Sequence, residues 1–303
     1  MNEEVLPDKA PMNDHAPMND EAPTTAEAIE RGYNNRAAVP DHPAWFARWA
    51  TLADVARTAA LFQGDVRYGP NPKETLDIFL PKGPPRGTFV FIHGGYWRSL
   101  DKHEHAFVAP PLLAAGHAVV LLNYDLCPDV SVATILEECR RAIAWIVRDG
   151  ARHGLPEGDL VVSGHSAGGH LAAMLHATDW TVQGLGRSPI TAGVSLSGVH
   201  DLLPLVQASM NADLRLDAAE AARLSPIHYR PTTDAPFLIA VGADETSEFL
   251  RQSDLLWRAW AGDRRHPIEG PLRIPERHHF SVVADYADPS AALTRRTLAL
   301  FGR

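Results

Sequence analysis

The chain has 303 residues, of which 45% are hydrophobic and 21% are charged, fractions that are typical of a folded globular protein. Its formal net charge is −9 and it contains no run of lysine or arginine, which argues against a nucleic-acid partner and against an anionic membrane surface. No window approaches the ~20 apolar residues that a membrane span needs. We therefore expect a soluble protein that acts on a small molecule.

The two cysteines, Cys127 and Cys139, are too few to form the disulfide framework of a secreted scaffold. Both fall in or beside a predicted buried helix, and the N-terminus lacks an apolar signal segment. A cytoplasmic protein with reduced thiols is the expectation. The sequence leaves open whether two copies of the protein associate as a homodimer.

The first residues differ in composition from the rest of the chain. The motif APMND occurs at positions 10–14 and again at 16–20, within a segment rich in proline and acidic residues. Such a segment cannot bury enough apolar surface to offset the entropy lost on ordering. We predict a disordered tail over residues 1–27 and one folded domain over residues 28–303.

After the tail, short β-rich runs alternate with helical patterns. The predicted strands are Asp65–Tyr68, Thr75–Leu80, Thr88–His93, Ala118–Asn123, Leu160–Ser163, Ile190–Leu196, Phe237–Val241 and Leu272–Ile274. Several are continuous apolar runs, as expected of central parallel strands that are covered on both faces. Apolar residues at three- and four-residue steps over residues 132–147 predict a helix between two such strands.

The first two strands are joined by the turn-rich GPNPKE and are expected to form an antiparallel hairpin at one edge of the sheet. The remaining alternation of strand and helix predicts an α/β fold. Its central sheet is mostly parallel and is flanked by helices.

The sequence FIHGGYW follows the third predicted strand. A Gly-Gly pair at this place lets backbone N–H groups point into a cleft, where they could stabilise the oxyanion formed when a carbonyl is attacked. Gly94, Gly95 and Tyr96 are the candidate donors, although an isolated pair of glycines could equally form a tight turn. Tyr96 and Trp97 could border an aromatic substrate pocket or could pack over this loop.

The sequence LVVSGHSAGGHLAAML has the G-x-S-x-G pattern between a predicted strand and a predicted helix. A sharp strand-to-helix turn would lift Ser166 above the sheet, and the small flanking residues would let neighbouring backbones approach closely. Ser166 is the candidate nucleophile. The N–H of Ala167, at the start of the helix, would add a further donor to the oxyanion hole.

A serine nucleophile needs a histidine base, which is in turn oriented by an acid. With the order serine, acid, histidine, the base follows the last strand, where only His278 and His279 occur. Asp244 and Glu245 follow the preceding predicted strand and are the candidate acids. The pair His103 and His105 has a spacing that does not place both rings on one helix face, so we expect a solvated surface there and no metal site.

Several segments together resemble the kynurenine formamidases, or arylformamidases, of the α/β-hydrolase fold. The segments are HGGYWRS, DKHEHAF, LNYDLCP, GHSAGGHLAAML, SGVHDLLPL, RLSPIHY, VGADETSEFLRQS and HHF, and the resemblance extends from about Tyr33 to the C-terminus. It implies an α/β-hydrolase domain without a metal or organic cofactor. The implied reaction is the hydrolysis of N-formyl-L-kynurenine to kynurenine and formate in tryptophan degradation.

The resemblance also implies roles for single residues. Ser166 matches the nucleophile, and His279, immediately before Phe280, matches the base. The acid of the family lies three residues after the strand-end glycine and three before the Glu-Phe pair, which points to Glu245. Asp244 stays as the alternative acid if the loop turns one residue earlier.

Two other functions remain under consideration. A general carboxylesterase acting on short acyl or aryl esters would share every one of these residues. A non-catalytic binding protein on a hydrolase scaffold is disfavoured because serine, acid and histidine are all present in the required order.

Overall fold

The computed structural model describes residues 21–261 and 270–302, and an eight-stranded sheet forms its centre. The strands are β1 (Leu61–Arg67), β2 (Thr75–Leu80), β3 (Thr88–Ile92), β4 (Ala118–Leu122), β5 (Leu160–His165), β6 (Ala192–Leu196), β7 (Phe237–Gly242) and β8 (Leu272–Ile274). Their spatial order is β1-β2-β4-β3-β5-β6-β7-β8. The pairs β1–β2 and β2–β4 are antiparallel and all others are parallel. The predicted mostly parallel sheet with an antiparallel hairpin at one edge is confirmed.

All eight predicted strands are present, and β1 differs most from its prediction because it begins at Leu61 rather than Asp65. The register of β1 shifts between Gln63 and Val66, where Asp65 has a φ of +54°. This bulge interrupts the alternation of apolar and polar residues by which a strand is recognised. The sequence pattern therefore marked only the part of the strand beyond the bulge.

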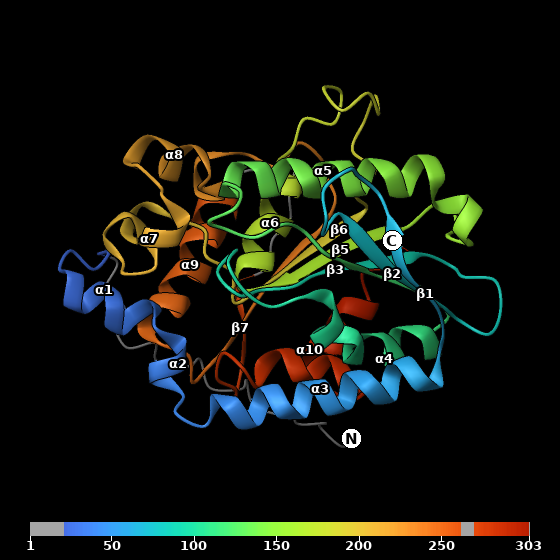
Figure 1. Ribbon diagram of the computed structural model, residues 1–303, viewed down its shortest axis with the longest axis horizontal. Helices are drawn as coiled ribbons and strands as arrows, with labels where there is room; N and C mark the ends of the chain where they lie inside the picture. The colour runs from blue at the N-terminus through green and yellow to red at the C-terminus, as the bar shows by residue number, and fades with distance from the viewer. Residues whose placement is uncertain (1–20, 262–269, 303) are drawn as a thin grey trace, which may run out of the picture.

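Helices cover both faces of the sheet (Figure 1). One face carries α5 (Val132–Asp149), α6 (Ala167–His176) and α9 (Ser247–Ala261), and the opposite face carries α3 (His42–Ala59), α4 (Ala109–Ala114) and α10 (Ala292–Leu298). Each layer buries its own apolar cluster against the strands, as both faces of a parallel sheet require. In the described residues, every helix lacks either the length or the apolar character that a membrane span requires.

Shorter helices and 3₁₀ turns complete the fold. The short helices are α1 (Ala26–Tyr33), α2 (Asn35–Ala38), α7 (Asn211–Leu214) and α8 (Ala218–Arg223), and the 3₁₀ turns are η1 (Lys102–Val108), η2 (Gly150–His153), η3 (Leu203–Gln207), η4 (Pro226–His228) and η5 (Val282–Ala287). Helix α1, capped by Thr25, begins two residues before the predicted domain start at residue 28. The APMND repeats of the predicted tail lie outside the described residues.

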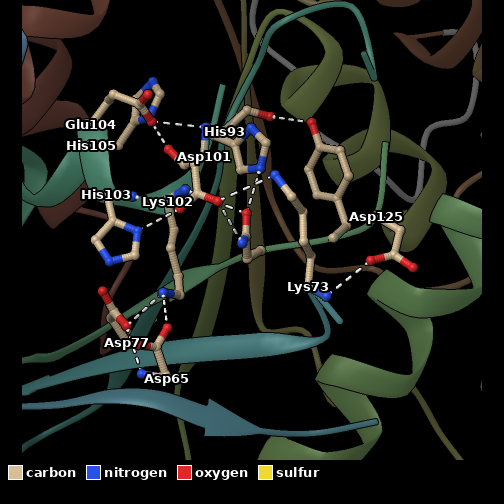
Figure 2. Close-up of polar contacts among 12 residues, drawn as sticks. Asp65, Lys73, Asp77, His93, Asp101, Lys102, His103, Glu104, His105 and Asp125 are labelled. Atoms are coloured by element: carbon tan, nitrogen blue, oxygen red, sulfur yellow. Dashed lines mark hydrogen bonds and ion pairs between the residues drawn. The ribbon is translucent and has the colours of Figure 1, made fainter. Parts of the chain in front are cut away.

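A buried ion network joins the edge hairpin to η1 (Figure 2). Lys102 is 1% exposed and its Nζ lies 2.7 Å from Asp65 and 2.9 Å from Asp77, while Arg57 of α3 lies 2.7 Å from the second oxygen of Asp77. Burial alone would raise the pKa of Asp77. The N–H of Asp65 and the cations Lys102 and Arg57 more than offset this effect, and the pKa is lowered.

We predict that Asp77→Asn lowers the free energy of unfolding by about 3–5 kcal/mol at pH 7, because Lys102 then keeps only a solvent-exposed partner. The lowered pKa of Asp77 means that its ionic contribution is fully present above the unfolded pKa of about 3.9 and is lost as the pH falls through the lower folded pKa. The difference in free energy of unfolding between Asp77→Asn and wild type should therefore become smaller below about pH 4.

Urea unfolding between pH 7 and pH 3 would measure this effect. Asp129→Asn, on the exposed surface, is the matched control and should change stability by less than about 0.5 kcal/mol. An Asp77→Asn penalty of the same size at every pH would contradict the ionic origin of the effect.

Candidate active site

Ser166 occupies the turn between β5 and α6. Its φ of +58° and ψ of −119° lie outside the regions that most residues adopt, and its N–H donates to Leu196 O on β6 at 2.8 Å. A Cβ at Gly168 would lie 2.0 Å from Ile92 O, so only glycine lets the first turn of α6 pass so close to β3. The turn therefore holds Ser166 at the carboxyl end of the sheet in the strained conformation that the G-x-S-x-G pattern predicts.

The loop after β3 lies against this turn. A Cβ at Gly94 would lie 2.8 Å from His165 O, which places the two backbones in direct contact. Among the residues that the structure describes, the N–H groups of Gly95, Tyr96 and Ala167 donate to no backbone acceptor. These donors remain available beside the serine, as an oxyanion hole requires.

The same loop holds an unusual backbone conformation, with φ values of +101° at Gly95, +51° at Tyr96 and +56° at Trp97. A positive φ costs about 1–3 kcal/mol at a residue other than glycine, so contacts must hold the loop in place. The Tyr96 hydroxyl donates to Tyr33 O of α1 at 2.6 Å, and the N–H of Cys127 donates to Trp97 O at 2.8 Å. Segments distant in the sequence thus fix the loop from two sides.

His93 supports the start of this loop, as Figure 2 shows. Its Nδ1 lies 2.9 Å from Gly94 O and its Nε2 lies 3.0 Å from the side-chain oxygen of Asn123, whose amide donates to Asp101 at 2.9 Å. The ring also stacks on Tyr124 at a centroid distance of 4.2 Å. Burial lowers the pKa of His93 to about 4, so the ring is neutral near pH 7 and braces the loop.

His279 follows β8 and lies in the same pocket as Ser166. Its Nδ1 lies 2.7 Å from Glu245 Oε2, and the Glu245 side chain is fully buried. The other oxygen of Glu245 accepts from the Ser197 hydroxyl and, at 2.9 Å, from the Gly242 N–H. Glu245 is thus held by donors on one oxygen and faces the imidazole with the other.

The neighbouring candidates lie elsewhere. Asp244 is exposed, and its N–H donates to Arg277 O at 3.0 Å, which ties the acid loop to the histidine loop through the backbone. His278 accepts from the N–H groups of Phe280 and Ser281, and its ring packs against Trp45 with the two centroids 5.1 Å apart. Of the two candidate acids and two candidate bases, Glu245 and His279 are the pair in contact.

His165 lies against His279, with ring centroids 4.6 Å apart. Burial, and then the adjacent His279, lower the pKa of His165 well below its usual value. The ring is therefore neutral near pH 7 and adds no positive charge beside His279.

A cavity of about 470 Å³ opens beside Ser166 and His279. The loop after β3 (residues 93–101), called the oxyanion loop for its predicted role, forms one wall, and aromatic side chains form another. Residues of α1, α2 and the segment before α7 complete the lining, and this part is called the mouth because Arg36, Ala37 and Ser209 in it are exposed. Its lining includes Glu30, Tyr33, Asn34, Arg36, Phe46, Trp49, Tyr96, Arg98, Ser209 and Phe280. A volume of this size suits a small organic substrate.

The structure decides between the two roles left open for Trp97 and corrects the expected solvation at His105, whereas His103 is exposed as expected. Trp97 is fully buried and packs edge-on against His170 at 5.0 Å, so it belongs to the core and is absent from the cavity wall, whereas Tyr96 lines it. His105 is buried between Trp49 and Phe91, not solvated, and burial lowers its pKa to about 3. The large apolar surface of α3, which packs on η1, explains this burial.

Sequence reasoning missed other parts of the site. Ser197 ends β6, and the parallel register of β6 with β7 brings it beside Glu245, although one serine among many gives no signal in sequence. Phe46 and Trp49 of α3 line the cavity and pack against each other, and their helical spacing in the sequence gives no sign of the first role. In the described ranges, no group of three or more His, Cys, Asp or Glu side chains is placed to bind a metal ion.

A family model named BD-FAE matches residues 76–260. Among curated proteins, kynurenine formamidase of Danio rerio is 30% identical over 257 residues, which are 82% of this chain and 85% of that protein. Esterase LipQ of Mycobacterium tuberculosis is 31% identical, over 74% of this chain and 58% of the esterase.

Solved structures show the same fold. A Silicibacter protein that was provisionally named a thioesterase superposes with a TM-score of 0.78 at 33% identity, covering 88% of this chain and 97% of that one. An esterase of Pyrobaculum calidifontis, at 17% identity and a TM-score of 0.64 over 87% of this chain and 92% of that one, shares the fold alone. The chain is therefore a serine hydrolase of the α/β-hydrolase fold, and it belongs to the BD-FAE family and to the kynurenine formamidase family.

Proposed function

We propose that this protein hydrolyses N-formyl-L-kynurenine to kynurenine and formate, with Ser166 as nucleophile, His279 as base and Glu245 as the acid that orients it. The similarity to kynurenine formamidases over most of both chains is the observation that carries the choice of substrate. The short contact between His279 and Glu245 beside Ser166 supports the three catalytic roles.

In the first half of the reaction, Ser166 Oγ attacks the formyl carbon while His279 Nε2 takes its proton. Glu245 accepts from His279 Nδ1, which fixes the tautomer of the ring and stabilises the imidazolium that forms. The N–H groups of Gly95, Tyr96 and Ala167, together with Gly94 as a further candidate, stabilise the oxyanion. His279 then protonates the aniline nitrogen, the C–N bond breaks and kynurenine leaves.

In the second half, water attacks the formyl group on Ser166. His279 removes a proton from this water and returns one to the serine oxygen, which releases formate. An aryl amine is a better leaving group than an alkyl amine, so this chemistry favours aryl formamides over alkyl amides. No cofactor enters the proposed reaction.

An esterase function is the second candidate, and the similarity to esterase LipQ favours it. It would use the same serine, histidine and oxyanion donors. The two functions differ in the acyl group and the leaving group that the pocket prefers.

We predict that the purified protein hydrolyses N-formyl-L-kynurenine with a kcat/KM at least ~10-fold above that for p-nitrophenyl acetate. Ser166→Ala should abolish both activities, because the same nucleophile serves both. Kynurenine release is followed by its absorbance. A large preference for the ester would replace the formamidase assignment with that of a carboxylesterase.

We also predict that Glu245→Gln lowers kcat by roughly 10²-fold or more, because a neutral amide can neither fix the His279 tautomer nor stabilise the imidazolium. Asp244→Asn, one residue away and exposed, is the matched control and should stay within about threefold of wild type. Steady-state kinetics of both variants decide the point. A larger loss for Asp244→Asn would transfer the acid role to that residue.

A further inference from the structure

The mouth of the cavity carries a cation, Arg36, that pairs with no carboxylate among residues 21–261 and 270–302. Arg36, at the end of α2, is exposed and lines the cavity, and its guanidinium lies 5.7 Å from the centroid of the Phe46 ring. In the part of the chain that the structure describes, no carboxylate pairs with Arg36. Arg98, the other arginine of the lining, is instead bound to Asp213 at 2.5 Å. Arg36 is thus available to bind an anionic group of a ligand.

A carboxylate lies in the same lining, one helix away. Glu30 of α1 accepts from the Asn34 amide at 2.9 Å and from the Ser209 hydroxyl at 2.7 Å. The hydrogen bond from Ser209 lowers the pKa of Glu30, so the group is ionised near pH 7. Both contacts are neutral donors. Glu30 therefore keeps its negative charge and has lone pairs left for a ligand cation.

The two charges are placed relative to each other by a short connection. Asn34 caps α2, where its side-chain oxygen accepts from the Ala37 N–H at 3.0 Å, and the same side chain donates to Glu30. Helix α1 is held in turn through Tyr33 O, which accepts from Tyr96 of the oxyanion loop, and through Gly32 O, which accepts from Thr246 at 2.7 Å. The charged mouth is thus fixed to the reacting end of the pocket.

Aromatic side chains line the cavity that Ser166 shares with Glu30 and Arg36. Phe46, Trp49 and Phe280 contact one another, with ring centroids 5.1–6.1 Å apart, and all three line the cavity. A flat aromatic ring can pack here while an attached acyl group reaches the serine. The pocket therefore combines a nucleophile, an aromatic wall and two charges of opposite sign.

We propose that Arg36 binds the α-carboxylate and Glu30 binds the α-ammonium of the substrate, so that the enzyme selects aryl formamides that carry a free amino-acid group. This inference rests on the proposed formamidase function and deepens it. A neutral ester or a simple aryl formamide would leave both charges without a ligand partner, and each charge-assisted hydrogen bond adds to the affinity only for a zwitterion.

The test compares two substrates with the same formamide and aryl ketone. N-Formyl-L-kynurenine carries the amino-acid group, and N-(2-acetylphenyl)formamide lacks it. The ratio of their kcat/KM values measures selection for the zwitterion. We expect Arg36→Gln to lower this ratio by ~10-fold, mainly through a higher KM for N-formyl-L-kynurenine, and Glu30→Gln to lower it by ~3–10-fold.

The matched controls are Arg31→Gln and Glu27→Gln on α1, which pair with each other and do not line the cavity. Both should keep the wild-type ratio. Arg36→Lys should recover part of the loss, because it restores the charge without the planar guanidinium. A wild-type ratio near one, or a loss in Arg36→Gln that is equal for both substrates, would overturn the proposal.

Product binding separates this inference from the proposed function. Calorimetry on Ser166→Ala should detect L-kynurenine, and adding Arg36→Gln should weaken that binding by ~10-fold. If wild type fails to cleave N-formyl-L-kynurenine but this difference in binding is found, the formamidase assignment fails and the zwitterion site stands. If L-kynurenine binds equally with and without Arg36, or does not bind, the zwitterion site is rejected whatever the enzyme cleaves.

Discussion

The site depends on one backbone constraint, the close passage of the turn at Ser166 against β3. The carbonyl of Ile92 leaves no room for a side chain at Gly168, and the serine takes a positive φ so that α6 can start at once. This contact brings the carboxyl ends of two parallel strands together. Ser166 on one loop and the N–H groups of Gly95 and Tyr96 on the other are neighbours for that reason, although the two loops lie far apart in the sequence.

The same edge of the sheet supplies the remaining groups. Ser197, Glu245 and His279 follow β6, β7 and β8, which pair in parallel, so each loop emerges beside the previous one. Because these strands are parallel, residues that follow successive strands in the sequence lie next to one another along one edge of the sheet. A glutamate suits this position because its side chain is longer than that of aspartate. One oxygen of Glu245 accepts from the Gly242 N–H while the other reaches the imidazole of His279.

Sequence patterns predicted the parts of this molecule that depend on local chemistry. Continuous apolar runs marked the strands, and the order of serine, acid and histidine marked the loops that carry Ser166, Glu245 and His279. Trp97 could not be placed in the same way, because a large aromatic residue near a motif is equally suited to a core and to a pocket. The contribution of α1 was also hidden, since its contact with the oxyanion loop depends on tertiary packing and leaves no periodic signal.

The anchoring of α1 on the oxyanion loop has a consequence for biosynthesis. Helix α1, which holds Glu30, precedes every strand of the described sheet in the sequence, whereas His279 follows all of them, and both residues line one cavity. Ser166 is likewise synthesised before His279, because β5 precedes β8 in the chain. The proposed pairing of Ser166 with His279 therefore cannot form until translation has passed β8.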